Sequence, residues 1–433
     1  MSARRGGPEP AAPTSRRRLA RTLTLMGICL ALLAAAVVVS VRALRPEPTV
    51  TLLANWEGAD KQNFEEAVIE PFERRYHIHV DYQGSSAESE VLGADVAAGT
   101  PPDIVVLTGP GELAAYQGEK VLKPLDGLVA PNEFSESWAT QVDGHLYWFP
   151  LKADLKSIVW YPGDMSAQQR RHDASQPGKW CLGMGSGATS GWPGTDWVED
   201  IVLQQNGPEF YERWARGEAR IWQSAPMKRA WKTWGRMVDA GGANVLSILK
   251  TGYKQASDPI TRTPPGCTLE HQGSYIRDEK RWQHVDGRYE PSSRFIPHAT
   301  ARHAWEVSGD LVALLNATPQ ARKLIRYLAS ADAQRAWNAK ESGFSVAAGA
   351  QRAEASAWHR SLSAILLDKQ AVHCFDASDA MPPTVRDAFA EAVIDFLAHP
   401  EHLDGLLKNL DSLRRAKGLT WLQSVCDRMP ASG

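Results

Sequence analysis

The sequence predicts an α/β fold that is built on a parallel β-sheet. Between residues 49 and 107, segments rich in strand-forming residues alternate with segments whose apolar residues repeat at the period of a helix. The last of these segments, residues 104–107, is apolar throughout and follows a turn, which is typical of a parallel strand buried on both faces. Strand, helix, strand, helix and strand in this order require crossover connections, as in α/β domains.

Each element of this first region has its own local signal. Residues 49–53 are rich in Thr, Val and Leu, and residues 77–82 alternate in polarity, so we expect a strand in each. In residues 60–75 the apolar side chains, among them Phe64 and Phe72, fall on one face of a helix. A second helix over residues 89–98 should end at the glycine that follows it.

The rest of the chain is mostly helical in its predicted elements. Residues 160–294 are rich in Gly, Trp and Pro, with loops expected at 258–266 and 286–293. Amphipathic spacing predicts helices in six segments, namely 198–205, 225–238, 318–330, 331–340, 384–397 and 403–416.

Length and composition limit the class of protein. The chain has 433 residues, enough for two domains with a sizeable core. Its net charge of −2 provides no basic surface, so no nucleic-acid partner is expected. Tryptophan is unusually frequent, with 16 residues against 10 Tyr and 10 Phe. These rings either fill the core or line a site for a ligand such as a sugar, which has apolar C–H faces and a hydroxyl rim.

The N-terminus predicts the compartment. Residues 1–22 are a disordered basic tail, residues 23–41 are an apolar run, and residues 42–48 are a linker. The run is close to the ~20 residues that a spanning helix needs and longer than a signal-peptide core. By the positive-inside rule, this transmembrane helix anchors the body of the chain on the extracytoplasmic face of the cell membrane. A cleaved signal, which would release a secreted protein, and a lipoprotein signal at Cys29 are the alternatives.

Four cysteines follow the N-terminal segment, an even number that suggests disulfides outside the cytoplasm. They are Cys181, Cys267, Cys374 and Cys426. Three pairings are open to them, and we expect Cys181–Cys267 and Cys374–Cys426. No two of them have Cys-x-x-Cys spacing, so we expect no zinc site, and we expect no other metal and no cofactor.

Eight short motifs follow one another across almost all of residues 50–430. In chain order they are Gly-Thr-Pro-Pro-Asp-Ile at 99–104, Lys-Ala-Asp with Val-Trp-Tyr at 152–161, Trp-Cys-Leu-Gly at 180–183, Ser-Gly-Trp-Pro-Gly-Thr-Asp-Trp-Val-Glu-Asp at 190–200, Pro-Gly-Cys with His-Gln-Gly-Ser at 265–274, Ala-Ser-Ala-Asp-Ala-Gln with Trp at 329–337, Gly-Phe-Ser at 343–345 and Phe-Asp-Ala-Ser-Asp at 375–379. Together they resemble the family 1 extracellular solute-binding proteins of sugar ABC importers, and most of all the α-glucoside-type binders.

This resemblance implies a type II periplasmic-binding-protein fold, in which two lobes close on a ligand by a hinge motion. The N-terminal transmembrane or signal helix would precede it. We expect residues 49–155 and about 295–345 to form the first α/β lobe. Residues 156–294 and about 346–433 would then form the second, mostly helical lobe.

The resemblance also implies a function and partners. The protein would bind a sugar, an α-glucoside or a small oligosaccharide, in the cleft between the lobes and deliver it to the permease subunits of an ABC importer. It would act as a monomer and would not be an enzyme.

The first candidate ligand contacts lie in loops after predicted strands, where the polar groups of α/β proteins collect. Trp56 and Glu57 follow the first strand, and Trp56 either stacks on a sugar or belongs to the core. Pro110 and Gly111 follow the strand at 104–107, in a turn where a ligand can reach backbone N–H groups. A plain turn is the alternative there.

The densest candidate segment combines rings with an acid. Trp192, Asp196 and Trp197 lie within six residues, and the glycines at 191 and 194 allow a tight bend. A carboxylate forms hydrogen bonds about twice as strong as those of a neutral acceptor, which suits sugar hydroxyl groups. We expect all three residues to bind the ligand, although Asp196 also fits the N-cap of the helix that follows.

Asp154 lies at an apparent crossing between the lobes and is a further candidate. An acid at this place can accept hydrogen bonds from two sugar hydroxyl groups. A salt bridge to Lys152 or to Lys156 is the alternative, since both lie two residues away.

Two more acids and a ring complete the candidate site. Asp376 and Asp379 stand on either side of an Ala-Ser pair, and they either bind the ligand or cap a helix. Phe344 follows a glycine and either lines the cleft near the hinge or fills the core.

Two rival functions follow from the sequence. The stretch from Gly163 to Lys179 is shorter than in the family, and Ser85 and Ser86 stand where relatives often carry an Arg-Asp pair. Both departures suit a degenerate binding protein that acts as a membrane-anchored sensor or structural module without transport. A glycoside hydrolase would need two carboxylates about 5–10 Å apart, such as Asp196 with Glu199, but no hydrolase motif is present.

Overall fold

The computed structural model describes residues 47–427, except 131–132, 135–137, 139–140, 279, 302, 341–342, 348 and 351–355. The basic tail, the apolar segment at 23–41 and most of the linker therefore lie outside the described residues. Within the described part, no helix combines the length and the apolar character that a membrane span requires.

A mixed sheet of six strands organises the fold. Its order is β11-β10-β3-β1-β2, and β6 pairs with β10. The strands are β1 (Thr49–Ala54), β2 (His79–Gly84), β3 (Ile104–Leu107), β6 (Trp148–Leu155), β10 (Ala304–Leu314) and β11 (Val372–Phe375). Because β1 pairs in parallel with both β2 and β3, the parallel sheet predicted from the sequence is confirmed.

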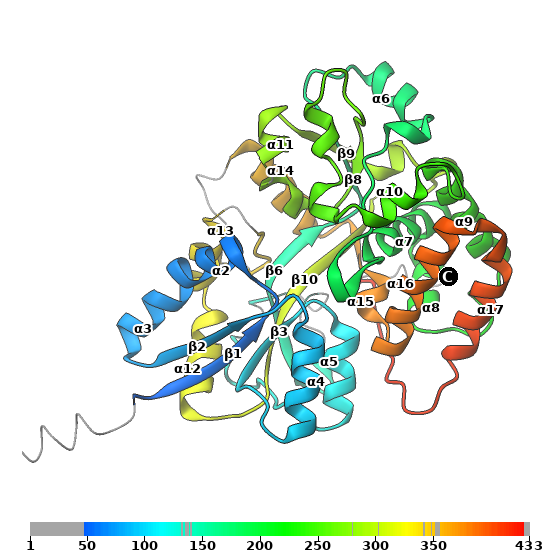
Figure 1. Ribbon diagram of the computed structural model, residues 1–433. Helices are drawn as coiled ribbons and strands as arrows, with labels where there is room; N and C mark the ends of the chain where they lie inside the picture. Colours follow the sequence, from blue (N-terminus) through cyan, green and yellow to red (C-terminus); the bar gives the residue numbers. More distant parts are fainter. Residues whose placement is uncertain are drawn as a thin grey trace, which may run out of the picture. The chain divides into compact units, whose positions relative to one another are not determined.

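Helices cover both faces of the sheet β2-β1-β3, as crossover connections require. Figure 1 shows α2 and α3 on one side and α4 and α5 on the other. The bounds are α2 (Gly58–Phe64), a π-helical turn η1 (Glu65–Ile69), α3 (Glu70–Tyr76), α4 (Glu88–Ala98), α5 (Pro110–Gly118), α12 (Pro319–Leu328) and α13 (Ala331–Asn338). The ring of Phe72 on α3 contacts that of Tyr327 on α12, with centroids 5.4 Å apart.

Two long strands, β6 and β10, run out of this sheet. One end of β10 pairs with β3 through Leu311 to Leu314, and its other end pairs with β11 through Ala304 to Val307. β6 lies antiparallel to β10 along nearly its whole length (Figure 1). The backbones approach closely at Gly309, where a Cβ atom would lie 2.8 Å from the carbonyl oxygen of Lys152. These two strands carry the chain from the first lobe to the second.

The second lobe is mostly helical around a small sheet of order β8-β7-β9. These strands are β7 (Ile158–Tyr161), β8 (Glu270–His271) and β9 (Arg288–Pro291), and a separate hairpin joins β4 (Gln141–Val142) to β5 (His145–Leu146). The prediction of a loop over 286–293 was wrong, because β9 lies within this segment. The strand forms by pairing with β7, which is far away in the sequence and therefore leaves no local signal.

The remaining helices have the following bounds: α6 (Ala167–Ala174), α7 (Trp192–Asn206), α8 (Pro208–Ala215), α9 (Ala225–Val238), α10 (Val245–Lys250), α11 (Lys280–His284), α14 (Ala357–Leu366), α15 (Ala377–Ala380), α16 (Pro383–Ala398) and α17 (Leu403–Leu413). Single 3₁₀ turns are η2 (Pro177–Lys179), η3 (Gly187–Thr189), η4 (Tyr253–Gln255), η5 (Asp258–Thr261), η6 (Ser274–Asp278), η7 (Ser292–Arg294) and η8 (Pro400–His402).

Most of the tryptophans fill the core rather than a site. Eight of them are almost completely buried, namely Trp148, Trp160, Trp197, Trp214, Trp222, Trp231, Trp234 and Trp282. The indole N–H groups of Trp214, Trp222, Trp231 and Trp234 find no hydrogen-bond acceptor among the described residues. These rings therefore act as large apolar side chains.

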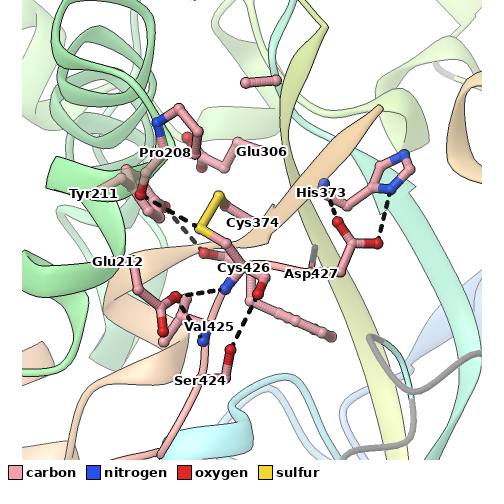
Figure 2. Close-up of a disulfide and its surroundings, with 12 residues drawn as sticks. Pro208, Tyr211, Glu212, Glu306, His373, Cys374, Ser424, Val425, Cys426 and Asp427 are labelled. Carbon is pink, nitrogen blue, oxygen red and sulfur yellow. Dashed lines mark hydrogen bonds and ion pairs between the residues drawn. A yellow bond between two sulfur atoms is a disulfide. The ribbon is translucent and has the colours of Figure 1, made fainter. Parts of the chain in front are cut away.

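Both expected disulfides are present, Cys181–Cys267 and Cys374–Cys426. The second fastens the C-terminal segment to β11 (Figure 2). Beside it, a carboxylate oxygen of Glu212 accepts hydrogen bonds from the backbone N–H groups of Val425 and Cys426, at 2.9 and 2.7 Å. Asp376 directly follows β11, so the disulfide and these hydrogen bonds help to fix the position of Asp376.

Candidate functional site

A cavity of about 1520 Å³ is the candidate site. The segments that follow β1, β2 and β3, which include the first turns of α2 and α4, contribute residues 55–60, residues 86 and 88–90, and Thr108, so the carboxyl ends of three parallel strands meet there. The crossing strands β6 and β10 and several helices of the second lobe line the rest. The volume exceeds the ~300–1,000 Å³ of most small-molecule pockets, so the cavity has space for an oligosaccharide.

The first-lobe side of the cavity is organised around Asp310 of β10. Its carboxylate accepts hydrogen bonds from the indole N–H of Trp56 at 3.0 Å and from the side-chain amide of Asn55 at 3.2 Å. The pKa of Asp310 lies above its usual value, because the effect of burial exceeds the opposite effects of the charge of Lys152 and of these two hydrogen bonds. This arrangement holds the ring of Trp56 in place at the cavity wall.

The second-lobe side carries a group of three rings. The ring of Trp192 lies 4.8 Å from that of Tyr253 and 6.3 Å from that of Tyr275, and all three residues line the cavity. Their edge-to-face arrangement is typical of stable aromatic pairs. Flat rings of this kind can stack on the C–H face of a sugar.

At the base of the cavity, one lysine joins two acids. The ammonium of Lys156 lies 3.0 Å from a carboxylate oxygen of Asp196 and 2.6 Å from one of Asp376. Burial raises the pKa of Asp196 to about 8 against the effect of Lys156. Burial also acts to raise the pKa of Asp376, but the charge of Lys156 and the hydrogen bonds from Lys156 and from the backbone N–H of Asp379 outweigh it, so this pKa lies below its usual value.

Asp376 also caps a helix. Its carboxylate accepts a hydrogen bond from the backbone N–H of Asp379 at 3.0 Å, as the N-cap of α15. From the sequence, Asp376 was expected either to cap a helix or to lie in the ligand cleft, and in the structure it caps α15 and also lines the cavity. Asp379 lines the cavity as well, and burial and the charge of Asp376 raise its pKa well above the usual value.

Two further acids lie behind this group. Glu199 of α7 and Glu306 of β10 are fully buried, and burial followed by neighbouring acids raises the pKa of each well above its usual value. Carboxylate oxygens of Asp196, Glu306 and Asp376 lie within 4.8 Å of one another, the one such group among the described residues. Because the ammonium of Lys156 contacts two of the three, the protein itself supplies the positive charge there, and we assign no metal ion to this place.

Asp154 lies on β6 and points into the cavity. Its carboxylate lies 3.5 Å from the ammonium of Lys152 and accepts a hydrogen bond from the hydroxyl of Ser274 at 2.8 Å. The salt bridge considered from the sequence therefore forms with Lys152. Lys156 forms its contacts with Asp196 and Asp376 instead.

Seven of the eleven sequence-predicted ligand residues line the cavity: Trp56, Glu57, Asp154, Trp192, Asp196, Asp376 and Asp379. Pro110 and Gly111 do not line it. They begin α5 and are buried against the chain at Ala380 and Met381, whose carbonyl oxygens leave no space for a side chain at Gly111. This turn therefore serves packing between elements.

Trp197 and Phe344 also lie away from the cavity lining. Trp197 is buried in α7, where its ring packs on Trp180 and on His271. The helix α7 begins at Trp192 and not at residue 197, so Trp192 and Trp197 point to different sides of it, and Asp196 lies inside the helix rather than at its N-cap. Phe344 is buried against Trp358 and His359.

Several lining residues were not identified from the sequence. Asp310, Tyr253, Tyr275 and Arg386 come from four separate segments that only the fold brings together. Asp310 follows a glycine within an apolar strand, and an acid inside such a strand is a signal that could have found it. The other three have ordinary surroundings in the sequence.

Comparisons with known proteins agree with this geometry. The sequence profile of the family described as bacterial extracellular solute-binding protein matches residues 55–258. This match confirms the resemblance inferred from the motifs.

Two curated relatives are similar over most of the chain. The alpha-glucosides-binding periplasmic protein AglE of Rhizobium meliloti (strain 1021) is 28% identical over 409 residues, which cover 84% of this chain and 88% of the relative. The osmoprotective compounds-binding protein GgtB of Synechocystis is 28% identical over 382 residues, covering 80% of this chain and 88% of the relative.

Solved structures show the same two-lobe fold. The bacterial solute receptor AcbH, whose structure is described with a preference for β-D-galactopyranose, matches with a TM-score of 0.70 at 14% identity, over 85% of this chain and 98% of that one. A chitin oligosaccharide binding protein matches with a TM-score of 0.69 at 18% identity, over 85% and 98%. At these identities the likeness concerns the fold.

Proposed function

We propose that this chain, a relative of the bacterial extracellular solute-binding proteins, binds a carbohydrate in the cavity between its lobes and delivers it to the permease of an ABC importer. The observation that carries the proposal is the composition of one continuous lining. Trp56, Trp192 and Tyr275 offer ring faces, and Asp154 and Asp376 offer charged acceptors for hydroxyl groups. A sugar needs both kinds of contact at once.

The ligand class that we favour is an α-glucoside or a small oligosaccharide. The similarity to AglE over most of both chains supports the first choice, and the volume of about 1520 Å³ supports a ligand longer than one sugar ring. The equal identity to GgtB makes osmoprotective polyols a necessary part of the test. We further propose that residues 23–41 hold the protein at the extracytoplasmic face of the membrane.

A thermal-shift screen of the full-length protein tests the binding function. Candidate ligands are mono- and disaccharides, including maltose and trehalose, and osmoprotective polyols. A ligand that binds only the folded state stabilises it by about 2.7 kcal/mol at a hundred times its Kd. We expect a clear rise in Tm with one sugar, and isothermal titration calorimetry then measures the Kd.

Matched variants connect the shift to the cavity. Trp192→Ala removes a ring of the lining and should abolish the shift, whereas Trp358→Ala removes a ring that packs on Phe344 away from the lining and should keep it. Cooperative melting without any shift would contradict the proposal and favour a degenerate module. Cleavage of an oligosaccharide during incubation would instead point to a hydrolase.

A further inference from the structure

Lys156 occupies a position that the sequence did not single out for ligand binding. It lies between β6 and β7 and is only 6% exposed. Its side chain reaches Asp196 on α7 and Asp376 at the start of α15, two acids that line the cavity. One ammonium therefore sets the direction in which two candidate ligand contacts point.

The backbone of Lys156 belongs to the crossing between the lobes. Its N–H donates a hydrogen bond to the carbonyl oxygen of Glu306 on β10 at 2.9 Å, and its carbonyl oxygen accepts one from Ile158 at 2.7 Å. The residue therefore connects both crossing strands to the two acids at the base of the cavity.

The charge around Lys156 is not balanced if every acid is ionised. Glu306 has no hydrogen-bond partner for either carboxylate oxygen among the described residues, and it is 0% exposed. Glu199 uses one oxygen to accept from the backbone N–H groups of Ala377 and Ser378, at 2.5 and 3.2 Å, and its other oxygen has no such partner. Four buried carboxylates face one ammonium, and a buried ion without a partner is costly.

Among the residues that the structure describes, no other basic group faces this cluster closely enough to supply the missing charge. The packed elements contribute Asp200 with His271, which pair with each other at 2.7 Å, the phenols of Tyr211 and Tyr275, and Asp379. Arg386 of α16 forms its ion pairs with Glu112 and Asp387. Protons on the acids are therefore the remaining way to balance the cluster.

We propose that Lys156 is the positioning residue of the ligand site, holding Asp196 and Asp376 toward the ligand, and that Glu199 and Glu306 behind it stay protonated, so that the ammonium is shared between two acids and not among four. This inference rests on the proposed function. Burial, followed by the negative charge of the neighbouring Asp376, raises the pKa of Glu199 well above its usual value, which favours a proton on Glu199. Without those protons, two added negative charges would compete for the ammonium.

The binding arm of the test uses the sugar found by the thermal-shift screen and measures Kd by calorimetry from pH 6 to pH 9. Lys156→Met should weaken binding roughly tenfold or more at pH 7, since two charge-assisted contacts lose their orientation. Lys156→Arg, which keeps the charge, should bind more tightly than Lys156→Met. Lys228→Met, which breaks a surface ion pair with Asp404, is the control and should bind as the wild type does.

The pH profile separates positioning from a merely structural role. Wild-type affinity should fall in the alkaline range, where the buried acids lose their protons. Glu306→Gln should match the wild type at pH 7 and lose less affinity than the wild type at pH 9, where Glu199 alone of the two can still ionise. Wild-type affinity in Lys156→Met would overturn the inference. A loss of affinity in Glu306→Gln at pH 7 would overturn it too, because it would mean that Glu306 acts as an ion.

A second arm needs no sugar and keeps the two proposals apart. If Glu306 is protonated only in the folded state, raising the pH costs folded-state stability, and Glu306→Gln escapes this cost. The Tm of Glu306→Gln should therefore exceed that of the wild type by more at pH 8 than at pH 5. An equal or lower Tm at pH 8 would contradict the protonated acid, whereas a wild type that binds no sugar would contradict only the proposed function.

Discussion

At the scale of single residues, the chemistry of this site is determined by the neighbours of each buried acid more than by its residue type. Asp196 and Asp376 contact the same ammonium, yet burial raises the pKa of the first to about 8 while the pKa of the second is lowered. The difference arises because Asp376 accepts two further hydrogen bonds, from the hydroxyl of Ser378 and the backbone N–H of Asp379. Hydrogen bonds to the ionised form favour that form.

Glu88 provides a prediction at this scale. Glu88 is only 9% exposed, and this burial raises the pKa of its carboxyl group to about 8. Between the unfolded value near 4.5 and this folded value, the unfolded chain is ionised while the folded chain holds a proton, so stability falls as the pH rises through this range. Glu88→Gln should therefore raise the free energy of unfolding by about 2–4 kcal/mol at pH 8, since one pKa unit corresponds to about 1.4 kcal/mol.

Chemical denaturation at pH 4 and pH 8 measures this effect. The two proteins should differ least at pH 4, where both states hold the proton. Glu90→Gln, on the exposed side of the same helix, is the control. A gain of the same size at both pH values would show that lost side-chain packing or hydrogen bonding, and not ionisation, is responsible.

At the scale of elements, helix starts decide which side chains reach the cavity. The helix α7 begins at Trp192, with Gly191 before it in a left-handed conformation at a φ of 105°. A start at residue 197, which an N-cap at Asp196 would imply, would have left Trp192 in a loop, where the glycines at 191 and 194 allow a tight bend. Proline is well tolerated in the first turn of a helix, and packing of Gly194 against Val393 and Trp234 extends the helix backwards.

The start of α5 carries the prediction at this scale. A Cβ atom at Gly111 would overlap the carbonyl oxygen of Met381 and lie 2.6 Å from that of Ala380, so Gly111→Ala should destabilise the protein by about 1–3 kcal/mol. Gly405 lies in α17 with no atom within 4 Å of such a Cβ, so Gly405→Ala should instead stabilise it by about 0.5–1 kcal/mol. Urea denaturation of both variants measures the two effects, and equal effects would refute the close packing of α5 on α15.

At the scale of the whole molecule, separate parts of the chain are joined at a few buried places. The crossing strands provide one, and the disulfide Cys374–Cys426 provides another (Figure 2). A third is the ion pair of Arg386 on α16 with Glu112 on α5, at 2.9 Å, between residues 274 positions apart. The hydroxyl of Ser89 donates to the same carboxylate oxygen at 2.7 Å.

This ion pair carries the prediction at the largest scale. Arg386→Met leaves Glu112 buried without its partner and should cost about 1–3 kcal/mol, less than the ~3–5 kcal/mol of a fully buried pair because Arg386 is partly exposed. Adding Glu112→Gln should recover part of this loss. A double-mutant cycle from denaturation curves gives the coupling energy, and strictly additive effects would mean that the pair does not join these elements.

The sequence by itself determined the α/β fold, the order of most helices and the family resemblance, while the disulfide pairing was an expectation among three possibilities that the structure confirmed. These depend on local periodicity and on motifs of neighbouring residues, such as the run from Ser190 to Asp200. Both kinds of pattern involve residues that are close together in the sequence, so they can be recognised without the structure. Seven of the candidate residues line one cavity, but only Trp56 and Glu57 do so because they follow a strand of the predicted parallel sheet.

Only the tertiary structure decided the composition of the site and the charge of its acids. Lys156, Asp196, Glu306 and Asp376 come from four segments, and their distances depend on how β6, α7, β10 and α15 pack. Whether an acid is ionised depends on burial and on neighbours that are remote in the sequence, and neither can be read from local pattern. The same reason explains why most tryptophans belong to the core: a ring stacks on a ligand only where packing leaves one of its faces open.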